Sequence, residues 1–184
     1  MKILSNWFYR VSKGWVALAG VVVFLLFCLL VLPEQSQHSN EYSQGMGSPD
    51  TSFIYSGKSL YRMAEAYGEE GRAQYLHARW TFDLAFPLIY TFFLTTSISW
   101  LFQKNITPSS VWRMANLLPL VAMAVDFLEN TMTSLVFSQY PLHSLIGEVF
   151  APVFTPLKWV LILVNFCFLL AGFFITILRY FKKG

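Results

Sequence analysis

Four long apolar segments constrain this chain more than any other feature of its sequence. They cover residues 15–32, 80–102, 114–137 and 159–178, and a helix needs about 17–25 mostly apolar residues to cross a bilayer. The first segment is longer than the roughly 7–15 apolar residues of a cleaved signal peptide, so we expect it to be retained. The pattern predicts an all-α integral membrane protein: a four-transmembrane-helix bundle that forms a single membrane domain over residues 1–184.

Composition supports a membrane protein and excludes several soluble classes. Only 12% of the residues are charged and 55% are hydrophobic, whereas soluble domains carry about 25% charged residues. A chain with so little polar surface is neither a cytosolic enzyme nor a disordered segment, and two cysteines are too few for a secreted disulfide scaffold. The net charge of +3 is small, so we expect the lipid bilayer, and no nucleic acid, as the environment of the chain.

Basic residues gather next to particular ends of the spans. The N-terminal flank, the loop between the second and third spans, and the C-terminal tail contain bases and no acids: Lys2, Arg10 and Lys13; Lys104 and Arg113; Arg179, Lys182 and Lys183. The first loop, residues 34–78, holds six acids against the three bases Lys58, Arg62 and Arg72. The positive-inside rule therefore predicts that both termini are cytoplasmic, and that the long first loop and the third loop are extracytoplasmic.

The first and third loops differ in their expected local structure. Residues 34–50 are rich in Ser, Gln, Asn and Gly, which predicts a flexible linker. Apolar residues then recur at helical spacing over about residues 57–67, which predicts a short amphipathic helix on the outer membrane interface. The prolines of the third loop, residues 138–155, predict a short interfacial segment there.

Charged residues inside the spans are the main functional signal. Each costs at least about 2.5 kcal/mol near the centre of a span, so such groups face the bundle interior and find partners. At helical spacing they form two stripes, on the second and third spans, and the stripes meet at one depth near the start of the fourth span. We expect one polar cluster in the outer half of the bundle, made of Arg79, Asp83, Tyr90, Asp126, Glu129, Asn130 and Lys158. Its three acids face two bases, so one acid is expected to be protonated or to hold a cation or ligand.

Two of the acids are candidate catalytic residues. Asp126 and Glu129 are adjacent on one helix face and desolvated, which suits a general acid/base pair. The candidate binding residues share the same stripes, and the bases among them suit an anionic head group: Arg72, Tyr75, Arg79, Asp83, Tyr90, Asn130 and Lys158. The sequence thus predicts a site that binds, and in the case of an enzyme modifies, a lipid-like or anionic amphipathic small molecule.

Two other functions fit the same residues. In the first, the intramembrane salt bridges are structural, and the chain is a non-catalytic subunit or assembly factor with a membrane-protein partner. In the second, the cluster carries protons or ions, although four spans are few for alternating access. No paired His or Cys motif has metal-ligand spacing, so the sequence assigns no metal ligands, and it leaves any cofactor unknown.

Overall fold

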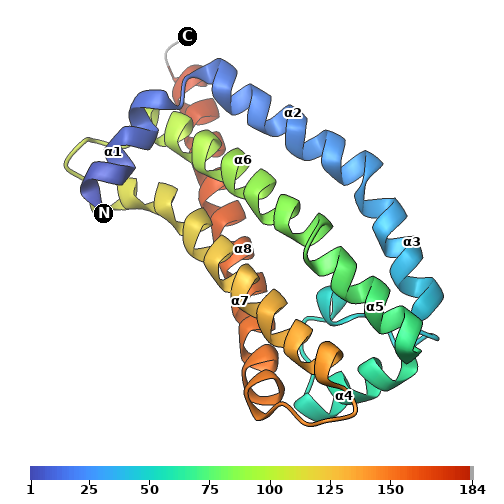
Figure 1. Ribbon diagram of the computed structural model, residues 1–184. Helices are drawn as coiled ribbons and strands as arrows, with labels where there is room; N and C mark the ends of the chain where they lie inside the picture. Colours follow the sequence, from blue (N-terminus) through green and yellow to red (C-terminus); the bar gives the residue numbers. More distant parts are fainter. Residues whose placement is uncertain (183–184) are drawn as a thin grey trace. The chain divides into compact units, whose positions relative to one another are not determined.

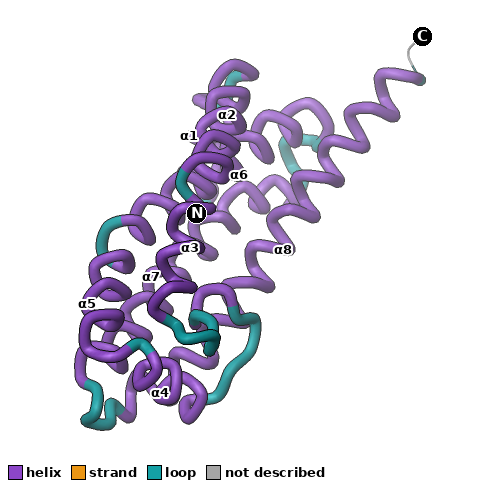
Figure 2. Tube along the Cα trace, turned by 90° about the vertical axis from the view of Figure 1, so that its right-hand side faces the viewer, coloured by secondary structure: helices purple, strands orange, loops and turns teal. Residues whose placement is uncertain are grey.

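The computed structural model describes residues 1–182, with the side chains of Gln35 and residues 38–40 left out. Its elements are α1 (Lys2–Val11), α2 (Gly14–Leu30), α3 (Leu32–Tyr42), the 3-10 helix η1 (Pro49–Thr51), α4 (Gly57–Ala66), α5 (Gly68–Arg79), α6 (Phe82–Asn105), the 3-10 helix η2 (Val111–Leu117), α7 (Leu118–Gln139) and α8 (Leu145–Phe181) (Figure 1). Within residues 1–182 there is no strand (Figure 2). The all-helical fold class is therefore confirmed.

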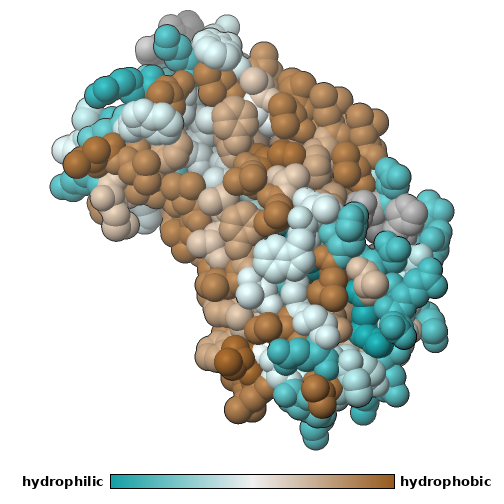
Figure 3. Space-filling model, in the orientation of Figure 1, coloured by the Kyte–Doolittle hydropathy of each residue, from teal (hydrophilic) through white to brown (hydrophobic). Residues whose placement is uncertain are grey.

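Four helical stretches are long and apolar enough to cross a membrane: Gly14–Glu34, Gly68–Asn105, Val111–Gln139 and Leu145–Phe181. This is an integral membrane protein with four candidate spans. Helix α2 shows why, since large apolar side chains such as Leu25 and Leu29 are 50% and 71% exposed on it. Figure 3 shows the hydrophobic surface along this helix. A helix that exposes apolar groups in this way has lipid as its solvent.

The predicted amphipathic helix at about 57–67 is present as α4. Its N-cap is Ser56, whose side chain accepts a hydrogen bond from the backbone N–H of Ser59. The apolar face of α4, with Leu60 and Ala64 fully buried, packs into a core that includes Val136 and Phe137 of α7. The apolar face of α4 is thus buried against other parts of the protein.

The structure corrects two loop predictions. The flexible linker is wrong for residues 34–42, because α3 continues to Tyr42; Pro33 and Glu34 stand in its first turn, where a fixed φ and a negative charge both favour a helix. A separate short segment over the third loop is also wrong, because α8 begins at Leu145 and continues without a break; whether its first turns lie at the interface stays a prediction. The Ser144 hydroxyl accepts a hydrogen bond from the N–H of Gly147 at this helix start, and membrane helices tolerate internal prolines such as Pro152.

By its internal contacts the chain divides into two compact units. Unit 1 contains residues 1–26, 88–122 and the segment from 160 onward; unit 2 contains residues 27–87 and 123–159. In unit 1, a Cβ on Gly20 would lie 3.1 Å from the Cα of Phe93, so α2 and α6 approach closely. The core of unit 2 is rich in tyrosine and includes Tyr55, Tyr67 and Tyr75. Whether residues 1–184 act as one domain stays a prediction.

Candidate functional site

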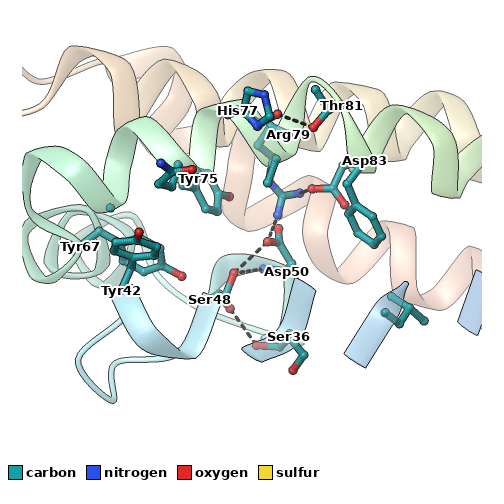
Figure 4. Close-up of a pocket in the computed structure, with 16 residues that line it drawn as sticks. Ser36, Tyr42, Ser48, Asp50, Tyr67, Tyr75, His77, Arg79, Thr81 and Asp83 are labelled. Carbon is teal, nitrogen blue, oxygen red and sulfur yellow. Dashed lines mark hydrogen bonds and ion pairs between the residues drawn. The ribbon is translucent and has the colours of Figure 1, made fainter. Parts of the chain in front are cut away.

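Arg79, the last residue of α5, is the centre of the first group of polar contacts in unit 2. The side chain is only 3% exposed and forms ion pairs with Asp50 and Asp83, the latter at 3.1 Å between Nη1 and Oδ2. The same Nη1 donates a hydrogen bond to Oδ1 of Asn130 at 2.7 Å. Figure 4 shows the guanidinium between the two carboxylates. Arg79 is thus held by three elements at once: the 48–51 segment, α6 and α7.

Lys158 of α8 is the centre of the second group. Its Nζ donates a hydrogen bond to Oε2 of Glu129 at 2.9 Å and lies 3.6 Å from Oδ1 of Asp126. Glu129 is completely buried, and its other oxygen, Oε1, accepts a hydrogen bond from the Thr155 hydroxyl at 3.0 Å. A carboxylate with both oxygens occupied in this way is stabilised as an anion although no water reaches it.

One turn of α7 links the two groups. Glu129 faces Lys158, while the next residue, Asn130, accepts from Arg79 and donates its Nδ2–H to the backbone carbonyl of Asp83 at 3.2 Å. The structure therefore brings together six of the seven residues that the sequence placed in one cluster. These residues are far apart in the sequence but meet in the fold, because polar side chains inside an apolar bundle pair with one another.

The remaining predicted binding residues are Tyr90, Arg72 and Tyr75. Tyr90 is buried in unit 1. The guanidinium of Arg72 donates to the backbone carbonyl of Ala64 at 3.0 Å and lies over the ring of Tyr140. Tyr75 lies under Arg79, at 4.7 Å from its ring centroid to the guanidinium carbon, and stacks on Phe137. Arg72 thus ties α4 and α5 together, whereas Tyr75 forms part of the wall beside Arg79.

Sequence reasoning missed Asp50, because it placed that residue in a flexible linker. The available signal was the run Ser48-Pro49-Asp50, in which a Ser before a Pro typically starts a tight helical turn. In the structure Ser48 is the N-cap of η1, and its hydroxyl donates to Oδ2 of Asp50 at 2.8 Å. The turn aims the Asp50 carboxylate at Arg79.

Sequence reasoning also missed Tyr55 and Thr155, which extend the second group. The hydroxyls of Tyr55 and Thr155 lie 2.8 Å apart. Burial raises the pKa of Tyr55, and the nearby charge of Glu129 raises it further. The phenol therefore keeps its proton, which allows it to donate to Thr155 while Thr155 donates to Glu129. Thr155 precedes Lys158 by one helical turn, a spacing that could have indicated its role.

A pocket of about 500 Å³ lies beside the Arg79 group, within unit 2. Its wall comes from α3, the 48–51 segment, α5 and the start of α6, and it includes three tyrosines, an arginine and two acids (Figure 4): Tyr42, Tyr67, Tyr75, Arg79, Asp50 and Asp83. The lining residues of this pocket include neither of the catalytic candidates, Asp126 and Glu129. Two carboxylates and one guanidinium give this wall a formal charge of −1.

Three buried atoms in this wall have no hydrogen-bond partner: Oδ1 of Asp50, the hydroxyl of Tyr75 and Nε of Arg79. Both contacts of the Asp50 carboxylate use the other oxygen, Oδ2. An unpaired buried acceptor costs about 1–3 kcal/mol, so a ligand that donates a hydrogen bond there recovers that energy. Within the described part of the chain, no three His, Cys, Asp or Glu side chains gather closely enough to hold a metal ion.

No protein-family model, curated protein or solved structure matches this chain.

Proposed function

We propose that unit 2 binds a lipid-like amphipathic molecule in the pocket beside Arg79. The observation that carries this proposal is the buried, unpartnered Oδ1 of Asp50 in the pocket wall. The volume of about 500 Å³ lies in the range of about 300–1,000 Å³ that is usual for small-molecule sites. Leu32 and Phe82 supply apolar surface for the chain of such a molecule.

The charges around the pocket favour a cationic head group over the anionic one that the sequence suggested. Arg79 already faces two carboxylates, and Lys158 faces two others. The positive charge of each base is therefore already compensated by two carboxylates, whereas Oδ1 of Asp50 is an acceptor without a partner. The rings of Tyr42, Tyr67 and Tyr75 in the same wall suit an ammonium group, which is attracted to aromatic faces. An amine-bearing amphiphile therefore matches the wall best.

Asp126 and Glu129 have a structural role in this proposal. Glu129 is completely buried and both of its oxygens are occupied, so it has no free position for a substrate proton. We name the contacts of Lys158 with Asp126 and Glu129, together with the hydrogen bond from Thr155 to Glu129, the Lys158 clamp. It joins α7 to α8. We therefore propose binding without chemistry as the activity of unit 2.

Three probes with the same 18-carbon chain test the proposal: oleylamine, oleyl alcohol and oleic acid. The full-length protein in mild detergent is titrated with each, and binding is followed by native mass spectrometry and by the thermal unfolding midpoint. We expect oleylamine to bind at least about tenfold more tightly than oleic acid, which corresponds to 1.4 kcal/mol. Tighter binding of oleic acid would contradict the assignment of a cationic head group.

Paired variants separate the pocket from general detergent effects. Asp50→Asn removes a charge from the wall, and Glu70→Gln makes the same chemical change at an exposed position of α5 outside the pocket. We expect Asp50→Asn to abolish the preference for oleylamine and Glu70→Gln to leave it unchanged. Equal behaviour of the two variants would refute the pocket as the site.

The Lys158 clamp also supports a second candidate, a non-catalytic membrane subunit or assembly factor. Its ion pairs need no ligand to explain them, because Lys158 already has the carboxylates of Asp126 and Glu129 as counter-charges. Failure of all three probes to bind, together with recovery of one stoichiometric membrane protein after affinity purification, would favour this function. Proton or ion flux in proteoliposomes would favour transport instead.

We also propose that both termini of the chain are cytoplasmic. Bases without acids flank the spans at both termini and between α6 and η2, and the positive-inside rule assigns such segments to the cytoplasmic side.

A further inference from the structure

Helix α1 is fastened to η2 by side-chain hydrogen bonds within unit 1. The Ser5 hydroxyl donates to Oδ1 of Asn116 at 2.8 Å, and Nδ2 of Asn116 donates back to the Ser5 carbonyl at 3.2 Å. The Tyr9 hydroxyl donates to the backbone carbonyl of Arg113 at 2.7 Å. These bonds set α1 in a defined position against η2, so the space between them has a defined shape.

That space is a pocket of about 240 Å³. Its polar lining includes Lys2, Asn6, Ser109, Ser110 and Arg113. Its volume falls below the range of about 300–1,000 Å³ usual for whole small-molecule ligands, so it suits a head group. All of these side chains are hydrogen-bond donors, and the bases provide two positive charges.

No acid of unit 1 balances the positive charge in this pocket. All 10 Asp and Glu residues of the chain lie in the segments of unit 2, so unit 1 contains none. Arg113 lies 3.8 Å from the centroid of the Tyr9 ring, and its Nε is buried without a hydrogen-bond partner. The contrast with Arg79 is direct: Arg79 is held by two carboxylates, whereas the guanidinium of Arg113 lies over the aromatic face of Tyr9.

Lys2 is in an unfavourable place for the helix itself. It begins α1, which has no acid in its first turn, and a positive charge at a helix N-terminus opposes the helix dipole by a few tenths of a kcal/mol or more. An anion bound beside Lys2 would offset this unfavourable interaction with the helix dipole.

Exposed apolar side chains occur on both of the helices that line the pocket. Ile3 and Trp7 of α1 are 87% and 51% exposed, and Val111 and Trp112 of η2 are 73% and 59% exposed. Tryptophan with an exposed indole is typical of the membrane interface, where head groups and acyl chains meet. A site for a free inorganic anion has no need of such surroundings, whereas a phospholipid does.

We propose that the pocket between α1 and η2 binds the phosphate of an anionic phospholipid. Arg113 and Lys2 neutralise the phosphate, with hydrogen bonds from the serines and Asn6, and Trp7 and Trp112 lie at the level of the glycerol and upper acyl chains. The site lies in unit 1, so it is independent of the function proposed for unit 2.

The test is a native mass spectrometry titration of the full-length protein with dioleoylphosphatidylglycerol, dioleoylphosphatidylcholine and inorganic phosphate. We expect the phosphatidylglycerol adduct to form at least about tenfold more tightly than the phosphatidylcholine adduct. We expect the phosphatidylglycerol adduct to persist when inorganic phosphate is added at about tenfold molar excess over the lipid. Displacement of the lipid by that phosphate, or equal binding of both lipids, would overturn the proposal.

Variants distinguish the pocket from diffuse attraction. Arg113→Gln and Lys2→Gln remove charge from the pocket, and Lys13→Gln removes the same charge from an exposed position between α1 and α2. We expect each pocket variant to weaken phosphatidylglycerol binding about tenfold and the control to change it less than about twofold. Equal losses in all three variants would overturn the proposal. Lys2 is exposed, so the Lys2→Gln result decides even if Arg113→Gln fails to fold.

Discussion

Glu129 is the acid at the centre of the Lys158 clamp. It is fully buried, and Lys158 and Thr155 donate hydrogen bonds to its two carboxylate oxygens. Replacing one member of a buried ion pair leaves the other charge without compensation, which costs more than the pair itself contributes. Stability measurements on these residues therefore report on the whole clamp.

Replacing Lys158 tests this dependence. Lys158→Met leaves Asp126 and Glu129 buried together, and we expect a loss of about 3–5 kcal/mol in the free energy of unfolding. The thermal unfolding midpoint in detergent measures it. Lys58→Met, at an exposed position of α4, is the matched control and should be nearly neutral. Adding Glu129→Gln to Lys158→Met should restore part of the loss; no restoration would argue against an ion-pair origin.

The hydroxyl chain from Tyr55 to Glu129 gives a second test at the residue scale. Thr155→Val keeps the side-chain shape but removes the bond to Glu129 and leaves the Tyr55 hydroxyl unpaired, so we expect a loss of about 1–3 kcal/mol. Tyr55→Phe removes only one bond and should cost about 1 kcal/mol. Because the two residues share that bond, the double variant should be less destabilised than the sum of the singles. Strict additivity in the unfolding midpoints would contradict the chain.

At the scale of elements, small residues decide how closely helices approach. Gly147 of α8 lies against α7: a Cβ there would come 2.7 Å from Cγ2 of Val136 and 2.8 Å from the carbonyl oxygen of Met132. The second of these is a backbone atom, which cannot move aside as a flexible side chain can. The start of α8 is therefore set by this one contact as well as by the Ser144 cap.

Gly147→Ala should separate α7 from α8. We expect a loss of about 1–3 kcal/mol, the usual cost of overpacking, seen as a lower thermal unfolding midpoint. Gly14→Ala is a suitable control, because the nearest atoms to its Cβ, at 3.1 Å, belong to the Trp100 side chain. If both variants unfold at the same temperature, the close approach at Gly147 is not a constraint.

Elements differed in how well their sequence predicted them. The apolar segments predicted α2, α6, α7 and α8 because burial in lipid depends on the sum of local hydrophobicity. The polar residues of α3 have no comparable summed hydrophobicity, so their composition predicted a linker where the structure has a helix. The start of α8 was missed because Pro152 and Pro156 predicted a break that a membrane helix does not require.

At the scale of the whole molecule, charge is divided between the units. Unit 1 contains eight of the 13 Lys and Arg residues and no acid, and unit 2 contains all 10 acids. This division matches the proposal that the basic segments lie on the cytoplasmic side, as the positive-inside rule assigns them.

Cysteine accessibility tests the proposed orientation. With Cys28 and Cys167 replaced by Ala, Ile54→Cys and Thr107→Cys are placed in the first and second loops, and both native residues are exposed. A membrane-impermeant maleimide added to intact cells should label Cys at 54 and not at 107, and lysis should expose both. Labelling of position 107 in intact cells would reverse the topology.

The sequence by itself determined the membrane class, the four apolar helices, and the meeting of Arg79, Asp83, Asp126, Glu129, Asn130 and Lys158. These follow from one-dimensional quantities: hydrophobicity summed along a segment, helical spacing, and the cost of an unpaired charge in lipid. Only the tertiary structure decided which acid pairs with which base, that Asp50 joins Arg79, and that a pocket lies beside them. Those outcomes depend on the path of the 48–55 segment through space, which is set by packing against distant residues such as Thr155.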